Sequence, residues 1–549
     1  MKTKAISLLF ALSLTALSCR CTPDSGSVSY DNRIFVDATV RGAPVPGICS
    51  NVNAWNMGVL YHHPAKNPEA EVFRFVRYVQ FMQCSGGNDY RDLFKDPYDR
   101  SVLDDYDFGN LIANCRGVLA MGAKPHLKLG SVPLKFTTDP LIGTFGTNIY
   151  PPDDYGQYYI YIRDLVTELV KEFGLDEVRS WRFGCMTEYE NYEWFQARSG
   201  KAGDSCEAYC KLYDYTVQAL TDVLGLDVFV GAHSMTCSKG GWDEAKFIDH
   251  VANGVNYANG GKGTPLCFLS ASFYDHHPGQ FSKGLDLPAT VSYLREAAGK
   301  AGLHDLIFGI DEGRLLNGVR RGNVGKELYN RTVGYTWQAA YDARLYKQGI
   351  DSGLDYFSMW NYLTGGNISG YPIISYHVAD RISRMAGMAR SDVEVHFEAL
   401  DGAEVDCLAA STDGAVCLMV YNFKNDLNYR RRFNYTLSVR LPFSSRKVVL
   451  TRYLVNDDCN FFDEWMADRE SLGITDSDSE WSPDDPCLDI QKTLSSPSAR
   501  RKYNEVRDKY IECARLTPST EEKSVSGGLL TLEETIEASN VMFLEIKPK

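Results

Sequence analysis

The sequence predicts an α/β protein, a (β/α)₈ TIM barrel followed by an antiparallel β-sandwich. From about Gly47 to Met388, short apolar runs alternate with segments whose apolar residues recur every three or four positions. Beyond Met388 the pattern changes to short strands separated by turn residues. Strands that alternate with helices pair in parallel through right-handed crossovers, and eight such strands close into a barrel.

The amino-terminal segment, residues 1–19, has the pattern of a secretory signal. Lys2 and Lys4 precede an apolar stretch over residues 5–17, which is too short to cross a membrane as a stable helix. Residues 16–19 resemble a bacterial lipoprotein cleavage site. We therefore expect an exported bacterial protein, tethered to a membrane surface if Cys19 is lipidated and otherwise periplasmic or secreted.

Residues 20–44 read as a polar tether and a strand over Ile34–Val40, and residues 45–388 as the barrel. After a first strand near Gly47, the expected barrel strands are 73–79, 124–129, 178–188, 228–231, 266–270, 305–312 and 354–360. The helices between them are expected at 108–119, 158–173, 209–224, near Phe247, at 289–301 and at 333–345. Glycines that follow two of these helices, Gly122 and Gly174, favour a helix end.

Residues 389–549 are expected to form the sandwich. Its strands are predicted at 395–400, 405–410, 415–421, 435–441, 448–453 and 541–546. A long polar insertion, roughly 457–517, interrupts them and contains one predicted helix, 498–516. No internal repeat is visible.

Composition and charge exclude some partners. Of 549 residues, 44% are hydrophobic and 23% are charged, as in an ordinary globular protein, and the net charge is −14. Because nucleic-acid binding needs a basic face, no such partner is expected. Most of the 15 cysteines are scattered in apolar runs and read as buried hydrophobes. Cys206 and Cys210 lie one helical turn apart without partners for a zinc site, so no metal or cofactor is expected. The oligomeric state is left open.

Two acidic residues stand at the ends of predicted barrel strands. Glu188 ends the run 178–188, and Glu312 ends the run 305–312. A parallel barrel brings such strand ends to one mouth, and two facing carboxyl groups are what glycoside hydrolysis requires. Since side chains alternate along a strand, Asp311 is expected to be structural if Glu312 faces the mouth. Glu190, a rival of Glu188, lies past the expected strand end.

Several segments carry a resemblance to a known family. They are residues 106–108, 121–133, 151–155, 174–178 and 181–191. Together they resemble glycoside hydrolase family 39, a family of (β/α)₈ retaining glycosidases that includes β-xylosidases and α-L-iduronidases. The resemblance covers almost the whole mature chain. It implies that Glu188 is the acid/base, that Glu312 is the nucleophile and that no cofactor is needed.

The chain departs from the family pattern near both glutamates. Thr187 replaces an Asn that binds the sugar 2-hydroxyl, and Tyr189 replaces a Pro. Residues 311–313 read Asp-Glu-Gly where many members have Thr-Glu-Trp, and Ser272 stands where a His is common. The resemblance therefore does not imply that this chain acts on the family's usual substrate.

The resemblance implies further site residues. Arg77 would keep the nucleophile ionised, Tyr274 would donate a hydrogen bond to it, and Trp360 would stack on the sugar at subsite −1. The plainer alternatives are a salt bridge at the barrel bottom for Arg77 and core positions for the two aromatic residues. His126 and His233, at predicted strand ends, are candidates to bind sugar hydroxyls. Thr187 is also a candidate substrate-binding residue.

The function expected from these residues is a retaining exo-glycosidase that is β-xylosidase-like or acts on a related pentoside or hexoside. One alternative is an α-L-iduronidase-like enzyme, suggested by residues 311–312 and 375–377, in which Lys128 and Arg314 are candidates to bind a uronate carboxylate. Two others are a non-catalytic carbohydrate-binding barrel and a polysaccharide lyase. The sugar, anomer and linkage are left open.

Overall fold

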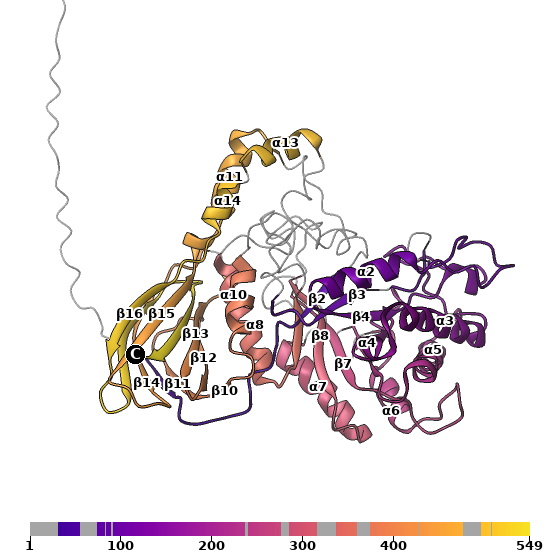
Figure 1. Cartoon of the computed structure of the whole chain (residues 1–549), viewed down its shortest axis with the longest axis horizontal. Coiled ribbons are helices and arrows are strands. Elements are labelled where there is room, and N and C mark those ends of the chain that lie inside the picture. The colour runs from indigo at the N-terminus through magenta and orange to yellow at the C-terminus, as the bar shows by residue number, and fades with distance from the viewer. Residues whose placement is uncertain are drawn as a thin grey trace, which may run out of the picture.

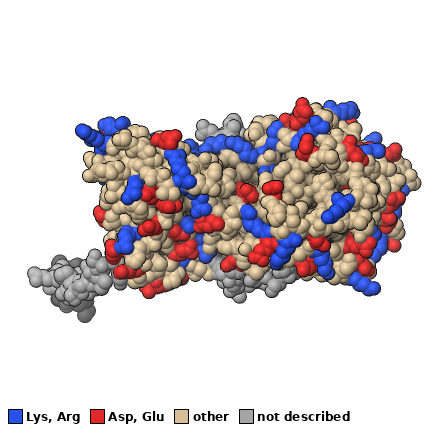
Figure 2. Space-filling model, turned by 90° about the horizontal axis from the view of Figure 1, so that it is seen from below, with Lys and Arg blue, Asp and Glu red and all other residues tan. Residues whose placement is uncertain are grey.

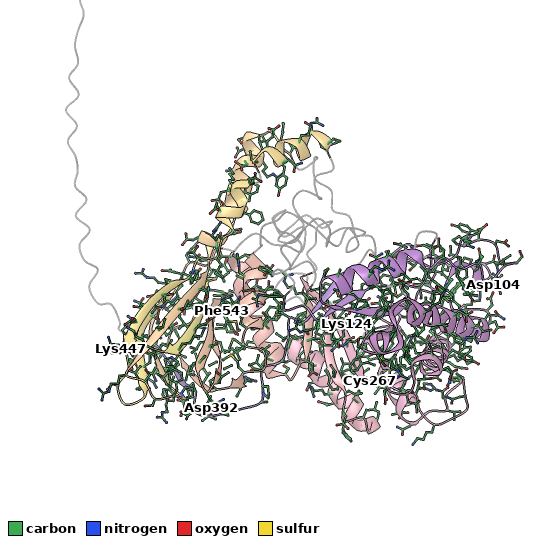
Figure 3. The ribbon with its side chains drawn as sticks, viewed as in Figure 1. Asp104, Lys124, Cys267, Asp392, Lys447 and Phe543 are labelled. Carbon is green, nitrogen blue, oxygen red and sulfur yellow. The ribbon has the colours of Figure 1, made fainter. Side chains whose placement is uncertain are left out.

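The computed structural model describes residues 31–54, 74–82, 84–88, 92–235, 240–275, 285–315, 336–359, 374–426, 428–475, 496–506 and 508–549. These residues form a barrel and a β-sandwich that lie side by side (Figure 1). In the view with side chains, Lys124 and Cys267 lie in the barrel, whereas Lys447 and Phe543 lie in the sandwich (Figure 3).

Eight parallel strands form the barrel wall, and each is paired with the next along the chain. They are β2 (Asn51–Ala54), β3 (Tyr78–Phe81), β4 (Lys124–Leu129), β5 (Arg182–Cys185), β6 (Phe229–Ser234), β7 (Phe268–Asp275), β8 (Ile307–Leu315) and β9 (Tyr356–Met359). The backbone N–H of Phe357 on β9 donates to the carbonyl of Ile48, just before β2, at 2.7 Å. This bond joins the last strand to the first, so the sheet closes as the sequence predicted.

Helices between the strands cover the outside of the barrel. They are α2 (Gly109–Ala120), α3 (Tyr155–Phe173), α4 (Leu175–Arg179), α5 (Ala202–Leu224), α6 (Ala245–Asn253), α7 (Leu287–Ala301), α8 (Thr336–Asp351) and α10 (Ile374–Ser383), with a 3₁₀ turn, Leu134–Phe136, after β4. The Asp154 side chain caps α3 by accepting from the N–H groups of Gly156 and Gln157. Gly174, with φ 89°, ends the same helix.

Alternation along each strand divides apolar from polar side chains. On β4, Leu127 and Leu129 are buried in the main apolar core. His126 and Lys128 point the other way, and both pack near the position where a side chain on Gly184 of β5 would lie. The barrel lumen is therefore lined by polar and charged groups at these positions.

Strand β8 departs from regular alternation. Ala271 of β7 pairs with Ile310, but the next residue, Ser272, pairs with Glu312, so Asp311 is an extra residue in β8. Pairing with β9 is irregular over the same stretch, between Ile310 and Gly313. Such a bulge re-aims side chains. It allows Asp311 and the following Glu312 both to face inward, which strict alternation forbids.

The sandwich consists of two sheets. One has the order β11 (Asp392–His396), β1 (Arg33–Asp37), β14 (Phe433–Arg440) and β17 (Leu529–Ile536). The other has the order β10 (Ala389–Arg390), β12 (Glu404–Thr412), β13 (Ala415–Phe423), β18 (Val541–Pro548), β15 (Lys447–Val455) and β16 (Ser519–Ser524). The strand predicted near the amino terminus is thus β1, and it belongs to the sandwich, parallel to β14 and antiparallel to β11.

The insertion in the sandwich forms an arm that projects from it (Figure 1). It contains a 3₁₀ turn, Asp457–Cys459, and the helices α11 (Phe462–Ser471), α13 (Pro497–Val506) and α14 (Asp508–Cys513), so the single predicted helix is divided into two. Phe461, Tyr503 and Tyr510 form a small core within the arm. His377 of α10 lies with Nε2 2.7 Å from the Ala514 carbonyl, which attaches the arm to the barrel.

Acidic and basic side chains are interspersed on the face shown in Figure 2. Among the described residues, no helix has the length and hydropathy needed to cross a bilayer. The predicted signal segment, residues 1–19, and Cys19 lie outside the described residues.

Candidate active site

Glu188 lies in a short, strained segment that follows β5. The φ angles of Met186 and Glu188 are 61° and 44°, in the left-handed region that ordinary residues rarely adopt. The Glu188 side chain is 8% exposed, and its Oε2 accepts hydrogen bonds from Asn191 Nδ2 at 2.7 Å and Trp194 Nε1 at 3.0 Å. Two neutral donors therefore hold this carboxyl group at the barrel rim.

Trp194 is itself held in place by packing. Its ring stacks on Phe145 with 4.1 Å between the ring centroids, and it packs against Met82, which follows β3. A fixed indole N–H orients Glu188 without adding a charge beside it.

Glu312 lies at the bulge of β8. The Tyr274 hydroxyl of β7 donates to its Oε1 at 2.5 Å, and the Glu312 side chain is 8% exposed. This is the contact that the family resemblance implied for these two residues. A hydrogen bond donated to a carboxylate favours its ionised form.

A chain of contacts joins the two glutamates around the rim. Thr187, the neighbour of Glu188, lies with Oγ1 2.7 Å from His233 Nδ1. His233 Nε2 lies 2.8 Å from Ser272 Oγ, and Ser272 pairs with Glu312 across the sheet. Because four adjacent strands, β5 to β8, carry these contacts, both carboxyl groups belong to the same end of the barrel. Burial, with the nearby charge of Lys128, holds the pKa of His233 well below its ordinary value.

A buried ion pair lies beneath this rim. Lys128 Nζ is 3.1 Å from Asp311 Oδ2, and the exposed fraction of the lysine side chain is 1%. The Tyr356 hydroxyl donates to the other carboxylate oxygen, Oδ1, at 2.6 Å. Burial opposes ionisation of Asp311, but the charge of Lys128, the nearby His233 and His126 and the hydrogen bond from Tyr356 together outweigh it and hold the pKa of Asp311 far below its usual value.

Three predicted substrate-binding residues are buried. Thr187 and His233 bond to each other, and both also contact Lys128. His126 lies in the register row of Gln80 and Arg182, below Lys128, and its ring meets Phe268 edge-on. Burial lowers the pKa of His126 to about 3. None of the three presents surface to a sugar in this structure.

Arg77 is also misplaced by the sequence-based assignment. Arg77 precedes β3, at the amino-terminal end of the barrel. Its exposed guanidinium donates to the Arg74 carbonyl at 3.2 Å. Glu312 lies beyond the bulge, towards the carboxyl-terminal end of β8. Arg77 therefore cannot support the nucleophile. It lies at the barrel bottom, as in the plainer alternative, but there it donates to a backbone carbonyl and not to an acidic side chain.

Arg314 does not face the mouth. Its guanidinium is fully buried, forms an ion pair with Asp342 of α8 and donates to Ser375 Oγ at 2.8 Å. These partners lie in the helix layer outside the barrel strands. Arg314 is therefore unable to reach a substrate carboxylate.

Glu190 points behind the rim. Its Oε1 accepts from the Met235 N–H at 2.6 Å and from Ser234 Oγ at 2.9 Å. Burial and the neighbouring Glu244 raise the pKa of Glu190 to about 8. Its role is to fix the segment after β6, and Glu188 is the glutamate of this region that faces the site.

Three further predictions concern Trp360, metal binding and the cysteines. Trp360 lies outside the described residues. Among the residues that are described, no group of three or more His, Cys, Asp or Glu side chains has a metal-binding arrangement. The cysteines in this part of the chain, Cys206 and Cys210 included, are free thiols.

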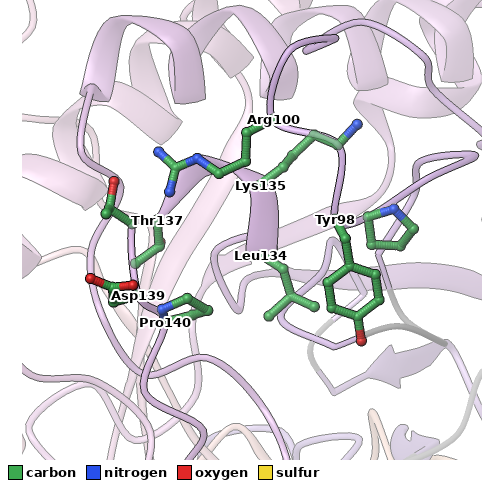
Figure 4. A pocket seen from close by; sticks show the side chains of 9 residues that line it. Tyr98, Arg100, Leu134, Lys135, Thr137, Asp139 and Pro140 are labelled. Atoms are coloured by element: carbon green, nitrogen blue, oxygen red, sulfur yellow. The ribbon is translucent and has the colours of Figure 1, made fainter.

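A separate surface cleft follows β4 (Figure 4). Tyr98 lies on one side, Asp139 and Pro140 lie on the other, and Leu134 lies between them. Its two cations are already paired, Arg100 with Asp153 and Lys135 with Asp105. Since it contains no pair of facing carboxyl groups, the rim with Glu188 and Glu312 is the better candidate for chemistry.

Comparison with known proteins agrees with this geometry. Residues 88–295, which include Glu188 but not Glu312, match the model of glycosyl hydrolases family 39. Over these residues the chain is similar to that family. A β-xylosidase from Caldicellulosiruptor saccharolyticus is 24% identical over 352 residues, which cover 58% of this chain and 64% of that protein. The chain thus matches slightly less than two thirds of this relative.

Solved structures of family 39 enzymes share the fold. The GH39 enzyme from Xanthomonas axonopodis pv. citri superposes with a TM-score of 0.64 at 15% identity, covering 96% of this chain and all of that one. A bacterial orthologue of human α-L-iduronidase gives a TM-score of 0.65 at 14% identity, with 95% and 84% covered. At such low identity these likenesses establish the architecture alone.

Sequence reasoning missed Trp194 and Asn191 as partners of Glu188, and it gave Lys128 a different role. A signal for Lys128 was present, because His126 and Lys128 alternate with leucines on one strand and so share the lumen face. No comparable signal identifies Trp194, since its contact with Glu188 depends on a loop conformation.

Proposed function

We propose that this chain is a member of glycoside hydrolase family 39 and a retaining exo-glycosidase that hydrolyses terminal glycosidic bonds, with a β-xyloside or a related neutral pentoside or hexoside as substrate. The observation that carries the proposal is the pair of largely buried carboxyl groups, Glu188 and Glu312, on one barrel rim. The family match and the named β-xylosidase relative support the same reading.

In the proposed mechanism, Glu312 attacks the anomeric carbon while Glu188 donates its proton to the leaving oxygen. The products of this step are the free aglycone and a glycosyl ester of Glu312. Glu188, now ionised, removes a proton from water, and the resulting nucleophile breaks the ester and regenerates Glu312. Two inversions at one carbon retain the anomeric configuration.

The neighbours of each carboxyl group fit these roles. Glu312 receives a hydrogen bond from Tyr274, which stabilises the charge of a nucleophile. Glu188 accepts hydrogen bonds from two neutral donors, Asn191 and Trp194. Neutral donors suit a group that must carry a proton at the start of the reaction better than a direct ion pair would.

A neutral sugar is favoured over a uronate. Lys128 and Arg314, the candidate partners of a uronate carboxylate, are both buried and already paired with Asp311 and Asp342. Recruiting either cation would leave a buried aspartate without its partner, which is costly.

A panel of aryl glycosides tests the proposal. It comprises the xyloside, arabinoside, galactoside, glucoside and iduronide in both anomers where available. We expect release of the aryl group from a neutral β-glycoside, and NMR of the first product is expected to show the substrate's own anomeric configuration. Inversion would exclude Glu312 as nucleophile. Release from the iduronide alone would replace the neutral-sugar assignment, and sugar binding without any release would indicate a binding protein. An unsaturated, ultraviolet-absorbing product would indicate a lyase.

We also propose that the chain is exported through residues 1–19 and tethered to a membrane surface by a lipid on Cys19. The test is metabolic labelling with a fatty acid analogue in a bacterial host. We expect label on the wild type and none on Cys19→Ala, and an unlabelled wild type would leave a periplasmic or secreted protein.

A further inference from the structure

Lys128 contacts the two residues that immediately precede the candidate catalytic glutamates. From β4, its Nζ donates to Thr187 Oγ1 at 3.3 Å and lies 3.1 Å from Asp311 Oδ2. Thr187 precedes Glu188, and Asp311 precedes Glu312. One side chain therefore joins the strand ends that carry both carboxyl groups.

The surroundings of Lys128 are closed to solvent and contain several ionisable groups. Asp311 and Glu312 face it from β8, Glu188 from the segment after β5, His233 from β6 and His126 from its own strand. Burial lowers the pKa of Lys128, and the negative charges of Asp311, Glu312 and Glu188 oppose that effect. Burial also keeps the two histidines neutral, with lowered pKa values, so they add no positive charge here.

We propose that Lys128 is a positioning residue of the glycosidase: it fixes the separation of the Glu188 and Glu312 strand ends, and it balances the charge of Asp311 so that Glu312 can remain ionised. The inference rests on the proposed function. Lys128 touches no substrate in this arrangement, because its side chain is buried beneath the rim.

The bulge in β8 explains why such a cation is needed. It turns Asp311 and Glu312, which are adjacent in sequence, towards the same side of the strand. Two like charges so close disfavour each other's ionisation. Because Lys128 is paired with Asp311, it compensates the negative charge of that aspartate. Ionising Glu312 then costs less free energy.

The decisive variant is Lys128→Met, which keeps the length of the side chain and removes its charge. We expect kcat/KM to fall about 100-fold, as misplaced catalytic groups cause. We also expect the acidic limb of the kcat/KM profile to move about one unit to higher pH, because Asp311 is then uncompensated beside Glu312. A purely structural role of Lys128 would lower the melting temperature without moving this limb.

Lys135→Met is the matched control. Lys135 is another buried lysine in an ion pair, with Asp105, on the segment that follows β4. Its loss is expected to lower the melting temperature while leaving the pH profile in place. Equal movement of the acidic limb in both variants would overturn the inference.

The double variant Lys128→Met with Asp311→Asn separates the two parts of the role and decides the matter if Lys128→Met does not fold. It removes both charges, and the Asn oxygen can still accept from Tyr356. We expect a folded protein whose acidic limb returns to the wild-type position, with kcat/KM still lowered at least tenfold because the contact with Thr187 is lost. Wild-type kcat/KM in this variant would overturn the inference.

The failure of the proposed function has a different signature. If the wild type releases no aglycone from any glycoside of the panel, the proposed function fails. If the wild type is active and both Lys128 variants match its rate and pH profile, only the role of Lys128 fails.

Discussion

The interior of the sandwich and the lumen of the barrel bury different kinds of side chain. Between the sheets of the sandwich lie apolar residues such as Leu418, Leu437 and Leu530. Inside the barrel, beneath the rim, Lys128 and Asp311 are buried as charged groups. Burying charged groups is costly even when they are paired. The charged lumen therefore contributes less to folding stability than the apolar interior of the sandwich does. The difference indicates that the sandwich interior serves stability and that the barrel lumen serves the site.

The largest expected effect is on the catalytic rate, when a residue of the barrel site is changed. Glu312→Gln removes the proposed nucleophile with almost no change of shape, so kcat is expected to fall about 10⁴-fold, or about 5 kcal/mol of transition-state stabilisation. The melting temperature is expected to stay close to that of the wild type. Aryl glycoside hydrolysis and thermal unfolding measure the two quantities. Glu193→Gln, an exposed glutamate near Glu188, is the control, and full turnover by Glu312→Gln would end the assignment.

A sandwich variant is expected to show the opposite behaviour. Leu437→Ala opens a cavity between the sheets, and the free energy of unfolding is expected to fall by about 3 kcal/mol. The kcat/KM of the folded protein is expected to change less than twofold. Urea unfolding and hydrolysis rates test this, with Ser438→Ala on the same strand as the control. A loss of kcat/KM at unchanged stability would contradict the division of roles.

How far the sequence predicts the structure differs between these regions. The eight barrel strands follow from apolar runs that alternate with helix patterns, and the strand ends identify Glu188 and Glu312. The membership of β1 does not follow, because its partners β11 and β14 are remote in sequence and its apolar pattern would suit any sheet. Pairing of that kind is decided by tertiary packing.

The site was predicted less completely, for geometric reasons. Arg77 was assigned to the mouth, yet β3 begins at Tyr78, so Arg77 lies at the far end of the barrel. His126 was assigned to a strand end, but β4 continues to Leu129 and places His126 below the rim. The bulge at Asp311 breaks the two-residue period on which the assignment of inward-facing residues depends.

A smaller effect is expected at the contact between Tyr274 and Glu312. Tyr274→Phe removes one hydrogen bond to a charged group, worth about 1.5–3 kcal/mol, so kcat/KM is expected to fall about 10- to 100-fold. The acidic limb of the kcat/KM profile is expected to move to higher pH, since the ionised form of Glu312 loses a donor. The profile of Tyr159→Phe, a tyrosine on the helix surface, serves as control. An unmoved limb and unchanged rate would show that the contact is unimportant.

The smallest effect expected is a pH dependence of stability. The folded state raises the pKa of Glu190 from 4.5 to about 8, through burial and then the charge of Glu244. Between these values the folded protein keeps a proton that the unfolded chain has lost, so this contribution to stability is present below pH 4.5 and is lost as pH rises through 8. Over the unit from pH 7 to 8, the wild type is expected to lose about 1 kcal/mol relative to Glu190→Gln.

Thermal unfolding of both proteins across this range measures that difference. A gap between wild type and Glu190→Gln that stays constant from pH 5 to 8 would contradict the raised pKa. Glu244→Gln is expected to narrow the gap, because it removes the neighbouring negative charge.

The position of β1 has a consequence for the order in which the chain folds. Ile34 pairs with Val395 and with Leu437, so this strand leaves the ribosome hundreds of residues before its neighbours exist. At roughly 5–20 residues per second, synthesis of the intervening chain takes roughly 20–70 s. During this time Ile34 and Val36, later fully buried, remain uncovered. We therefore expect the nascent strand to need shielding, for example by a chaperone, until its partner strands have been made.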